Sequence, residues 1–491
     1  MDERLARDVR RLAALSVIGY VALVAMSFYW GFLRSADLAA RPDNPRRILE
    51  ERRVQRGRIL DMQGQVLAFS EAPEAGAGGA PRRVYPHPAA APVVGFQTWR
   101  YGAGLDPAVT YGTGGAEAAY DVALRGDLGR SVSQQLASRV LKRPRAGRDV
   151  VLTLDVDLQN LASELLAGRS GAVVVLDVRS GAVRALASQP TFDPMALDAV
   201  AAGQAPPDQI MWNRATQGLY PPGSTWKMVT FAAALDQGLV APGDVVDDGA
   251  RVAYFDGFPV RCDNNPPGTD RFDMRHAFAY SCNVTFARLG EELGETRFRR
   301  YARAFGLGEA PPFPLPVAAG SLTDSNRMPL PELVSAAFGQ GKVLVTPLHM
   351  ALVAAAIARD GTVPVPVLLA DVPGVRWAGI ADERGTWRRA VTSATAAAVR
   401  EAMVVTAEEG WGQAARRAGG VSMGVKTGTA ETGRGSPHAW TVGFAPADAP
   451  RVAAAVVVEA GGSGAETAAP ITGRVLARAL ELDESAGASG R

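Results

Sequence analysis

Lysine is rare in this chain, and two of its lysines lie in short motifs that could carry out nucleophilic chemistry. Only four of the 491 residues are lysines (Lys142, Lys227, Lys342 and Lys426), although lysine and arginine together number 52. Arginine stays protonated in proteins, whereas a lysine can lose its proton when it is buried. A lysine that is retained in such an arginine-rich chain is therefore a candidate for amine chemistry.

The first motif is Ser224-Thr225-Trp226-Lys227. It follows two prolines and a glycine at 221–223, which predict a helix that begins at about Ser224. Residues three apart on a helix share a face, so the amine of Lys227 would lie beside the hydroxyl of Ser224. That amine could take the hydroxyl proton if burial and a second cation lowered its pKa. By itself, the string is explained equally well by a helix-capping serine followed by an incidental lysine.

The second cation could be Lys426, which opens Lys426-Thr427-Gly428-Thr429 on a predicted strand. Gly428 would let a substrate backbone approach the strand closely. The hydroxyls of Thr427 and Thr429, together with Lys426, could bind a substrate carboxylate. An exposed turn after a strand is the alternative interpretation of this motif.

Ser281-Cys282-Asn283 lies between these two motifs, 57 residues after Ser224 and 145 residues before Lys426. Ser281 could pass a proton between Lys227 and a leaving group, and Asn283 could hold a substrate amide. Alternatively, the two residues cap the next helix. The ordered set S-x-x-K, S-x-N and K-T-G is the active-site signature of penicillin-binding transpeptidases and serine β-lactamases.

The other reactive residue types carry weaker signals. His438 either lines the predicted cleft or is a surface histidine, and no Ser-His-Asp arrangement is indicated. Cys262 and Cys282 are 20 residues apart, and two buried free thiols are preferred over a disulfide because spacing cannot establish pairing. No metal site or cofactor is expected. With a net charge of +2 and no basic block interleaved with aromatics, nucleic-acid binding has no support.

The segment Leu12–Leu33 has no charged side chain over 22 residues. At about 1.5 Å per residue it would span about 33 Å, enough to cross a bilayer core. We expect an uncleaved anchor at 12–33 after a cytoplasmic tail at 1–11. A buried core helix and a cleaved signal peptide are the alternatives, but the apolar run is longer than that of a usual signal peptide.

The remaining chain is too long for one core and predicts an α+β protein of two domains. An irregular domain is expected at 34–149, a second domain at 150–482 and a disordered tail at 483–491. In the second domain a β-branched run, a glycine turn and another run predict a hairpin at 172–187. Helical periodicity is expected at 155–167, 225–237, 274–289, 346–358 and 469–480, and strands at 426–429, 440–444 and 451–458.

Over nearly its whole length the chain resembles the class B penicillin-binding proteins, which are membrane-anchored transpeptidases of peptidoglycan. Met62 and His349 depart from the residues that are common in that family at their positions, and neither is assigned a role. Besides the three motifs, the resemblance rests on Arg56-Gly57-Arg58-Ile59 with Asp61 and Gly64, Arg83-Val84-Tyr85-Pro86, Leu152-Thr153-Leu154-Asp155 and Phe338-Gly339-Gln340-Gly341.

The resemblance implies an antiparallel sheet flanked by helices, with an N-terminal pedestal and a cleft between the sheet edge and a helical lobe. It implies that Ser224 is the acylated nucleophile, that Lys227 is its base, and that Ser281 transfers a proton. Asn283 and Lys426-Thr427-Gly428-Thr429 would bind the donor stem peptide. The backbone N–H groups of Ser224 and Thr429 would form the oxyanion hole.

The implied reaction is D-Ala-D-Ala transpeptidation in the cell (inner) membrane, with the catalytic domain outside the cytoplasm. Peptidoglycan stem peptides would be the substrates and β-lactams the inhibitors. The segment before Gly147 is too short for a glycosyltransferase, so the implied polymerase is a separate, membrane-embedded protein of the SEDS type. A serine β-lactamase or β-lactam sensor, and a non-catalytic cell-wall scaffold, remain alternatives.

Overall fold

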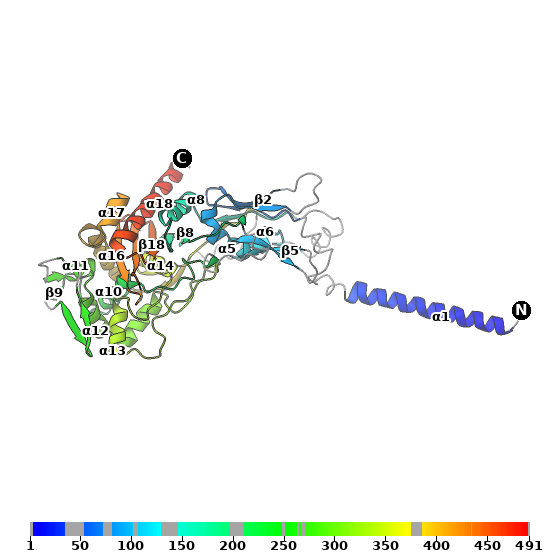
Figure 1. Cartoon of the computed structure of the whole chain (residues 1–491), viewed down its shortest axis with the longest axis horizontal. Helices are drawn as coiled ribbons and strands as arrows, with labels where there is room; N and C mark the ends of the chain where they lie inside the picture. The colour runs from blue at the N-terminus through cyan, green and yellow to red at the C-terminus, as the bar shows by residue number, and fades with distance from the viewer. Residues whose placement is uncertain are drawn as a thin grey trace.

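The computed structural model describes residues 3–34, 54–71, 81–101, 107–128, 146–196, 211–247, 251–262, 265–266, 271–374, 385–433 and 435–489. Helix α1 (Glu3–Phe28) continues into the π-helical turn η1 (Tyr29–Leu33). This helix stands apart from the body of the protein (Figure 1). Its segment Arg7–Leu33 is long and apolar enough to cross a membrane, and none of it is buried against the protein. The anchor prediction is therefore supported, although the helix begins at Glu3, inside the predicted tail.

A five-stranded antiparallel sheet forms the centre of the second domain. The hairpin expected from the sequence is present as β7 and β8, which occupy one edge of the sheet. The strand that carries the K-T-G motif, β16, forms the opposite edge. In spatial order the strands are β16 (Gly424–Ala430), β17 (His438–Ala445), β18 (Val452–Val458), β7 (Gly171–Asp177) and β8 (Val183–Gln189).

Helices cover both faces of this sheet, which explains why the inner strands β18 and β7 are almost entirely apolar instead of alternating. Successive residues of β7 belong to two different cores, Val173 to one and Val174 to the other. The core that contains Val173 is covered by α8 (Val156–Leu165), α17 (Gln413–Gly419) and α18 (Ala469–Ser489). The core that contains Val174 is covered by α10 (Lys227–Asp236), α14 (Pro347–Ala358) and α16 (Ser393–Glu408).

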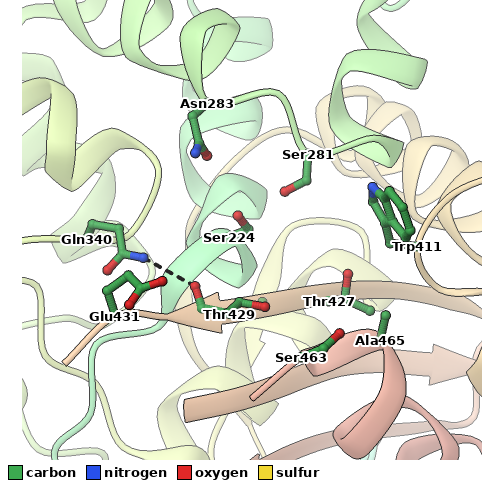
Figure 2. Close-up of a pocket in the computed structure, with 11 residues that line it drawn as sticks. Ser224, Ser281, Asn283, Gln340, Trp411, Thr427, Thr429, Glu431, Ser463 and Ala465 are labelled. Carbon is green, nitrogen blue, oxygen red and sulfur yellow. Dashed lines mark hydrogen bonds between the residues drawn. The ribbon is translucent and has the colours of Figure 1, made fainter. Parts of the chain in front are cut away.

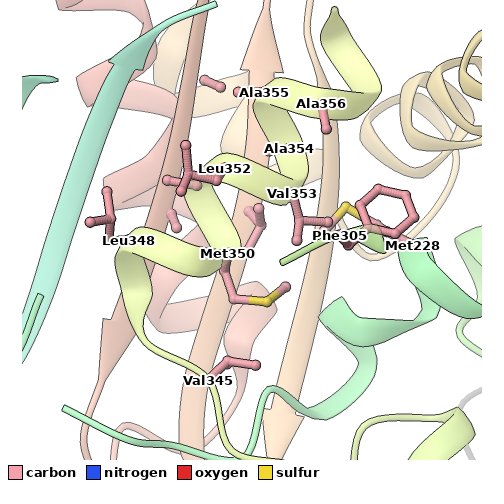
Figure 3. Packing of buried hydrophobic residues seen from close by; sticks show 14 of the residues in the cluster. Met228, Phe305, Val345, Leu348, Met350, Leu352, Val353, Ala354, Ala355 and Ala356 are labelled. Carbon is pink, nitrogen blue, oxygen red and sulfur yellow. The ribbon is translucent and has the colours of Figure 1, made fainter. Parts of the chain in front are cut away.

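Helix α14 is the central helix of the larger core. All of its residues are buried, so it is apolar around its whole circumference. Figure 3 shows its side chains packed between the sheet and the helical lobe, with Met228 and Phe305 at one side. Thr346 begins the helix as its N-cap, accepting a hydrogen bond from the backbone N–H of His349.

The helical lobe lies beside the edge strand β16. It contains α11 (Met274–Ala279), α12 (Asn283–Ala304) and α13 (Leu330–Ala337). Two small antiparallel sheets complete the lobe: the hairpin of β10 (Val252–Phe255) with β11 (Phe258–Arg261), and the pair of β9 (Val245–Asp247) with β12 (Arg271–Asp273), which enclose that hairpin in the sequence. The helical stretch expected at 274–289 is divided at the S-x-N motif, where the sequence had suggested that a next helix begins: Tyr280, Ser281 and Cys282 form a loop between α11 and α12.

A second sheet connects the two parts of the chain. It contains strands from both sides of the predicted boundary at 149 and 150, with β6 parallel to β1. Its order is β14 (Leu369–Asp371), β6 (Val150–Leu152), β1 (Ile59–Leu60), β2 (Val66–Glu71) and β3 (Arg82–Val84). The pedestal also has η2 (Pro88–Ala90), α4 (Ala91–Val94), α5 (Gly115–Ala119), α6 (Asp121–Leu124) and the hairpin β4 (Phe96–Tyr101) with β5 (Pro107–Thr113). Residues 35–53 and 129–145 of the pedestal prediction lie outside the described residues.

A buried carboxylate explains the arginines of the pedestal motifs. Glu117 is fully buried, and its two carboxylate oxygens accept hydrogen bonds from Arg56 at 2.6 Å and Arg83 at 2.7 Å. Burial alone would raise the pKa of Glu117, but the two guanidinium groups hold it below its ordinary value. Arg56 also bonds Asp121 at 2.6 Å. These long-range pairs join segments that lie about 30 to 60 residues apart.

The end of the chain differs from the expected disordered tail. Helix α18 continues to Ser489, and only residues 490–491 of the tail lie outside the described part of the chain. Asp483 accepts a hydrogen bond from Arg184 of β8 at 2.6 Å, and Glu484 pairs with Arg451 at 3.3 Å. The small polar residues of this segment gave no signal of those partners, which are distant in the sequence.

Candidate active site

The turn that presents Ser224 is tighter than an α-helix. Gly223–Trp226 forms the 3₁₀ turn η4, and α10 begins at Lys227. Side chains three residues apart lie on the same face of a 3₁₀ turn, so Ser224 and the residue that follows this turn, Lys227, are expected to share a face. Pro222 occupies the N-cap position and no side chain caps the turn, so Ser224 is not a helix cap. Its side chain is half-buried and lines a cavity.

Lys227 is fully buried and lies among neutral hydrogen-bonding partners. Its Nζ donates to the backbone oxygen of Ser281 at 2.6 Å and to Oδ1 of Asn283 at 2.7 Å, and lies 3.1 Å from Oγ of Ser281. A neutral amine has two N–H groups and one lone pair. The two carbonyl-type oxygens can only accept, so they use both N–H groups. The lone pair of neutral Lys227 is then left for a hydroxyl proton.

The electrostatics of the site favour that neutral amine. Burial, together with repulsion from Lys426, lowers the pKa of Lys227 well below its ordinary value. Burial also lowers the pKa of Lys426, to about 7. Lys426 is fully buried, and its Nζ donates to the backbone oxygen of Thr427 at 3.1 Å. The two lysines expected to act together are thus electrostatically coupled in the folded chain.

Ser281 adopts a backbone conformation that is unusual for its residue type. Its φ is 65°, in the left-handed region that non-glycine residues rarely occupy. This conformation lets both the carbonyl oxygen and the hydroxyl of Ser281 approach Lys227. The next residues do not form the cap that the alternative interpretation required, since α12 has no side-chain cap and Asn283 contacts Lys227.

The two cysteines form a disulfide, so the preferred interpretation of two free thiols is wrong. Cys262, just after β11, is bonded to Cys282, the middle residue of S-x-N. The sulfur of Cys262 also accepts a hydrogen bond from the backbone N–H of Val284 at 3.3 Å. The bridge ties the loop that carries Ser281 to the hairpin β10–β11. Spacing alone could not reveal the pairing because the approach of these segments is a tertiary feature.

The K-T-G motif lies on β16, in register with β17, with Lys426 opposite Val442 and Thr427 opposite Thr441. Gly428 lets the nucleophile turn approach this strand. A Cβ atom there would lie 3.0 Å from the backbone oxygen of Pro222 and 3.0 Å from Cγ2 of Thr225. The close contact at Gly428 is therefore between the strand and the turn, whereas the K-T-G motif had predicted a close approach of substrate to the strand.

One cavity of about 330 Å³ collects most of the predicted residues. Figure 2 shows Ser224 between Asn283 and Ser281 on the helical side and Thr427 and Thr429 on β16. Lys227 and Lys426 are not part of this lining but are hydrogen-bonded to residues that are. Lys227 donates to Ser281 and Asn283, and Lys426 donates to Thr427. The cavity is lined by Ser224, Ser281, Asn283, Gln340, Trp411, Thr427, Gly428, Thr429, Glu431, Ser463 and Ala465.

Five of these lining residues were not assigned to the site from the sequence. Gln340 donates to the backbone oxygen of Thr429 at 3.2 Å, and its position within the Phe338–Gly341 segment was the only available signal. Trp411 donates to the backbone oxygen of Tyr280 at 3.2 Å. Trp411, Glu431 and Ser463 come from loops and Ala465 from the π-helical turn η5 (Gly464–Ala468), and none of the four lies in a recognisable sequence pattern. His438 is not part of the lining, and its Nδ1 accepts from the backbone N–H of Ala460 at 3.0 Å.

Comparisons with known proteins agree with this geometry. The model of the penicillin binding protein transpeptidase domain matches residues 171–477, more than half of the chain. The peptidoglycan D,D-transpeptidase PbpA of Mycolicibacterium smegmatis is 35% identical, with 96% of this chain and 99% of the relative covered. The peptidoglycan D,D-transpeptidase MrdA of Acinetobacter baumannii is 32% identical over 73% of this chain and 59% of its own length.

Solved structures give the same result. The ceftriaxone acyl-enzyme complex of penicillin-binding protein A from M. tuberculosis superimposes with a TM-score of 0.74, at 33% identity, covering 87% of this chain and 98% of that one. PBP2 of Pseudomonas aeruginosa superimposes with a TM-score of 0.72 at 29% identity, covering 86% and 95%. The resemblance and fold class predicted from the motifs are thereby confirmed. The chain belongs to the penicillin-binding protein transpeptidase family and is a class B penicillin-binding protein.

Proposed function

We propose that this protein is a peptidoglycan D,D-transpeptidase that cross-links stem peptides through an acyl-enzyme on Ser224. The observation that carries the proposal is the contact set of Lys227, a buried amine bonded to Ser281 and Asn283 behind the cavity that Ser224 lines. The full-length similarity to proteins named peptidoglycan D,D-transpeptidase supports the reaction and the substrate. The β-lactam acyl-enzyme complexes of a relative support penicillin sensitivity.

In the acylation step, Oγ of Ser224 attacks the carbonyl carbon of the penultimate D-Ala of the donor. Neutral Lys227 accepts the hydroxyl proton as the new C–O bond forms. The negative charge that develops on the carbonyl oxygen is stabilised by the backbone N–H groups of Ser224 and Thr429. The C–N bond then breaks, and the proton reaches the departing D-Ala amine from Lys227 through the hydroxyl of Ser281.

In the second step, an amine of a neighbouring stem peptide attacks the acyl carbon. Lys227 accepts a proton from this amine and later returns one to Ser224 as the C–O ester bond breaks. The product is a new amide, which is the cross-link, and the free serine is regenerated. The same groups thus serve both half-reactions in opposite directions.

The donor carboxylate is bound at β16. Thr427 and Thr429 present hydroxyls at the cavity wall, and Lys426 lies directly behind Thr427. An ammonium and two hydroxyls form charge-assisted hydrogen bonds with a carboxylate. Asn283 faces the same cavity and holds the donor amide, while its Oδ1 remains bonded to Lys227.

Hydrolysis of the acyl-enzyme, as in a β-lactamase, receives less support from this site. Class A β-lactamases deacylate with a glutamate that is placed between S-D-N and K-T-G in the sequence. The carboxylate among the described lining residues is Glu431, which follows the K-T-G motif. Long-lived acylation by β-lactams is therefore expected.

The anchor places the reaction at the cell membrane. We infer that the catalytic domain is extracytoplasmic, because peptidoglycan lies outside the cell membrane and α1 precedes the whole body of the chain. Since the pedestal at 34–149 is too small for a glycan polymerase, we infer a membrane-embedded polymerase of the SEDS type as partner. Co-purification of the full chain with such a polymerase, lost when α1 is exchanged for an unrelated anchor, tests the pairing.

Labelling with a fluorescent penicillin tests the acyl-enzyme directly. Membranes that contain the wild-type chain are expected to give a labelled band, which Ser224→Ala abolishes. Ser485→Ala, on the exposed outer part of α18, is the matched serine control and should label like wild type. Intact-mass analysis and peptide mapping should place a single adduct on Ser224. An unlabelled wild-type protein would favour the scaffold alternative, and rapid loss of the adduct would favour a β-lactamase.

A further inference from the structure

Three phenylalanines form a buried cluster behind the two active-site lysines. Phe231 lies on α10, Phe278 on α11 and Phe286 on α12, and all three are fully buried. The ring centroid of Phe231 is 5.7 Å from that of Phe278 and 6.3 Å from that of Phe286. Phe278 and Phe286 are 6.1 Å apart. The cluster therefore joins the helix that carries Lys227 to both helices that flank the Ser281 loop.

Two of these rings each face one lysine. Nζ of Lys227 lies over the ring of Phe286, 5.3 Å from its centroid, and Nζ of Lys426 lies over the ring of Phe278, at 5.4 Å. The face of an aromatic ring is negative and attracts a cation within about 6 Å of the centroid. Phe231, in contrast, contacts the other two rings and has no such contact with a lysine among the described residues.

The polar surroundings of the two amines are neutral. Lys227 contacts Ser281 and Asn283, Lys426 contacts the backbone of Thr427, and no carboxylate pairs with either amine in the part of the chain that the structure describes. The charged group that acts on Lys227 is Lys426. The elements packed around the two amines carry other titratable groups that are exposed or bonded elsewhere, and these include Asp236, Asp273, Arg275, His276, Arg288, Glu291, Glu292, Glu295, Arg400, Glu401, Glu408, Glu431, His438 and Glu466.

We propose that Phe286 and Phe278 are positioning residues whose ring faces stabilise the ammonium forms of Lys227 and Lys426, respectively, in place of a carboxylate. A carboxylate beside Lys227 would hold its proton and prevent it from acting as a base. A carboxylate beside Lys426 would compete with the carboxylate of the donor. A ring face offers a weaker attraction than a carboxylate does, so it stabilises each ammonium without fixing its proton or competing for the donor carboxylate.

The scarcity of lysine allows a direct test. The full chain in detergent, labelled with ¹³Cε-lysine, contains four lysines, and Lys→Arg variants assign the signals of Lys227 and Lys426. In a pH titration, Phe286→Leu should lower the measured pKa of Lys227 by up to about one pH unit and leave that of Lys426 in place. Phe278→Leu should do the converse. Phe231→Leu, the matched control in the same cluster, should shift neither signal.

The direction of the shift separates this proposal from a purely apolar role. Leucine is smaller than phenylalanine and admits water, so if the rings only desolvate the amines, their removal should raise the lysine pKa values. A rise, no change, or an equal shift in Phe231→Leu overturns the proposal. If a leucine variant fails to fold, trifluorophenylalanine placed at 286 or 278 weakens the ring face at almost constant shape. That variant should lower the same pKa, and an unchanged pKa again overturns the proposal.

The consequence for catalysis rests on the proposed function and is measured separately. In the pH profile of acylation by a β-lactam, Phe286→Leu should move the acid limb to lower pH, and Phe278→Leu should move the alkaline limb to lower pH. If the lysine signals shift in the titration while neither limb moves, the aromatic stabilisation stands and the roles assigned to Lys227 and Lys426 are overturned. If neither the signals nor the limbs move, the aromatic proposal itself is overturned.

Discussion

Lys227 donates a hydrogen bond to the backbone oxygen of Ser281 over 2.6 Å, although the two residues are 54 positions apart in the chain. The carbonyl is available to Lys227 because Ser281 has a left-handed backbone conformation, with φ at 65°. The same contact places the amine beside the Ser281 hydroxyl, at 3.1 Å. The position of the Lys227 amine is therefore set by the loop between α11 and α12 as well as by its own helix.

Replacing the base by a permanently charged side chain tests its protonation state. Lys227→Arg keeps a positive charge but cannot lose a proton, so acylation by a fluorescent penicillin should slow by about 10²–10⁴-fold. Stopped-flow or gel-based labelling rates measure this. Lys342→Arg is the control, because Lys342 is half-exposed and pairs with Asp324 at 2.5 Å, away from the cavity. Similar rates for both variants would contradict the assignment.

The pH dependence of acylation should be bell-shaped. As pH rises through the lowered pKa of Lys227, the neutral base accumulates and the second-order acylation rate increases. As pH rises through about 7, Lys426 loses the proton that attracts a carboxylate, and the rate falls again. A β-lactam whose carboxylate is esterified should lack the alkaline limb. A rate that only rises between pH 5 and 9 with the free acid would argue against the role of Lys426.

A methyl group added at Gly428 of the K-T-G strand should displace the turn that carries Ser224. In Gly428→Ala the new Cβ atom would lie 3.0 Å from the backbone oxygen of Pro222, so the turn that carries Ser224 must shift. Displacements of this kind cost up to about 10²-fold in rate, and we expect acylation to slow while the melting temperature changes little. Gly243→Ala, whose Cβ meets nothing within 4 Å, is the control. Wild-type rates in Gly428→Ala would show that the turn has room to adjust.

Removing the buried charge of Glu117 should destabilise the pedestal. Glu117→Gln removes the carboxylate that pairs with buried Arg83 and leaves buried Arg56 with Asp121 alone, which should reduce the free energy of unfolding by about 3–5 kcal/mol. Thermal and denaturant unfolding of the full chain in detergent measure the change. Glu481→Gln, which removes an exposed partner of Arg478, should have little effect. If both variants lost the same free energy of unfolding, the buried ion pairs of Glu117 would contribute no more to stability than an exposed pair.

The membership of the candidate site could largely be predicted because the motifs are short and keep a fixed order. Ser224 and Lys227 share a turn, and the K-T-G residues share a strand, so their mutual positions follow from local geometry. Apolar runs likewise predicted the hairpin β7–β8 and the helix α14, since both are buried on all sides. At 274–289 local periodicity predicted helical residues on both sides of Ser281, but it could not predict the left-handed conformation of that residue.

Features that join distant segments could not be predicted in this way. The disulfide between Cys262 and Cys282, the bond of Asp483 to Arg184, and the cavity positions of Trp411 and Ser463 all depend on which segments meet in space. None of these partners is marked by spacing or composition.

The order and local spacing of its motifs thus determined that this chain has the parts of a penicillin-binding transpeptidase behind a membrane anchor. Only the tertiary structure decided that two lysines 199 positions apart are buried close enough to repel each other, and that phenyl rings lie beside them. The physical reason is that a nucleophile and its neighbour are linked through the backbone, whereas charge coupling and burial arise only when remote surfaces pack together and exclude water.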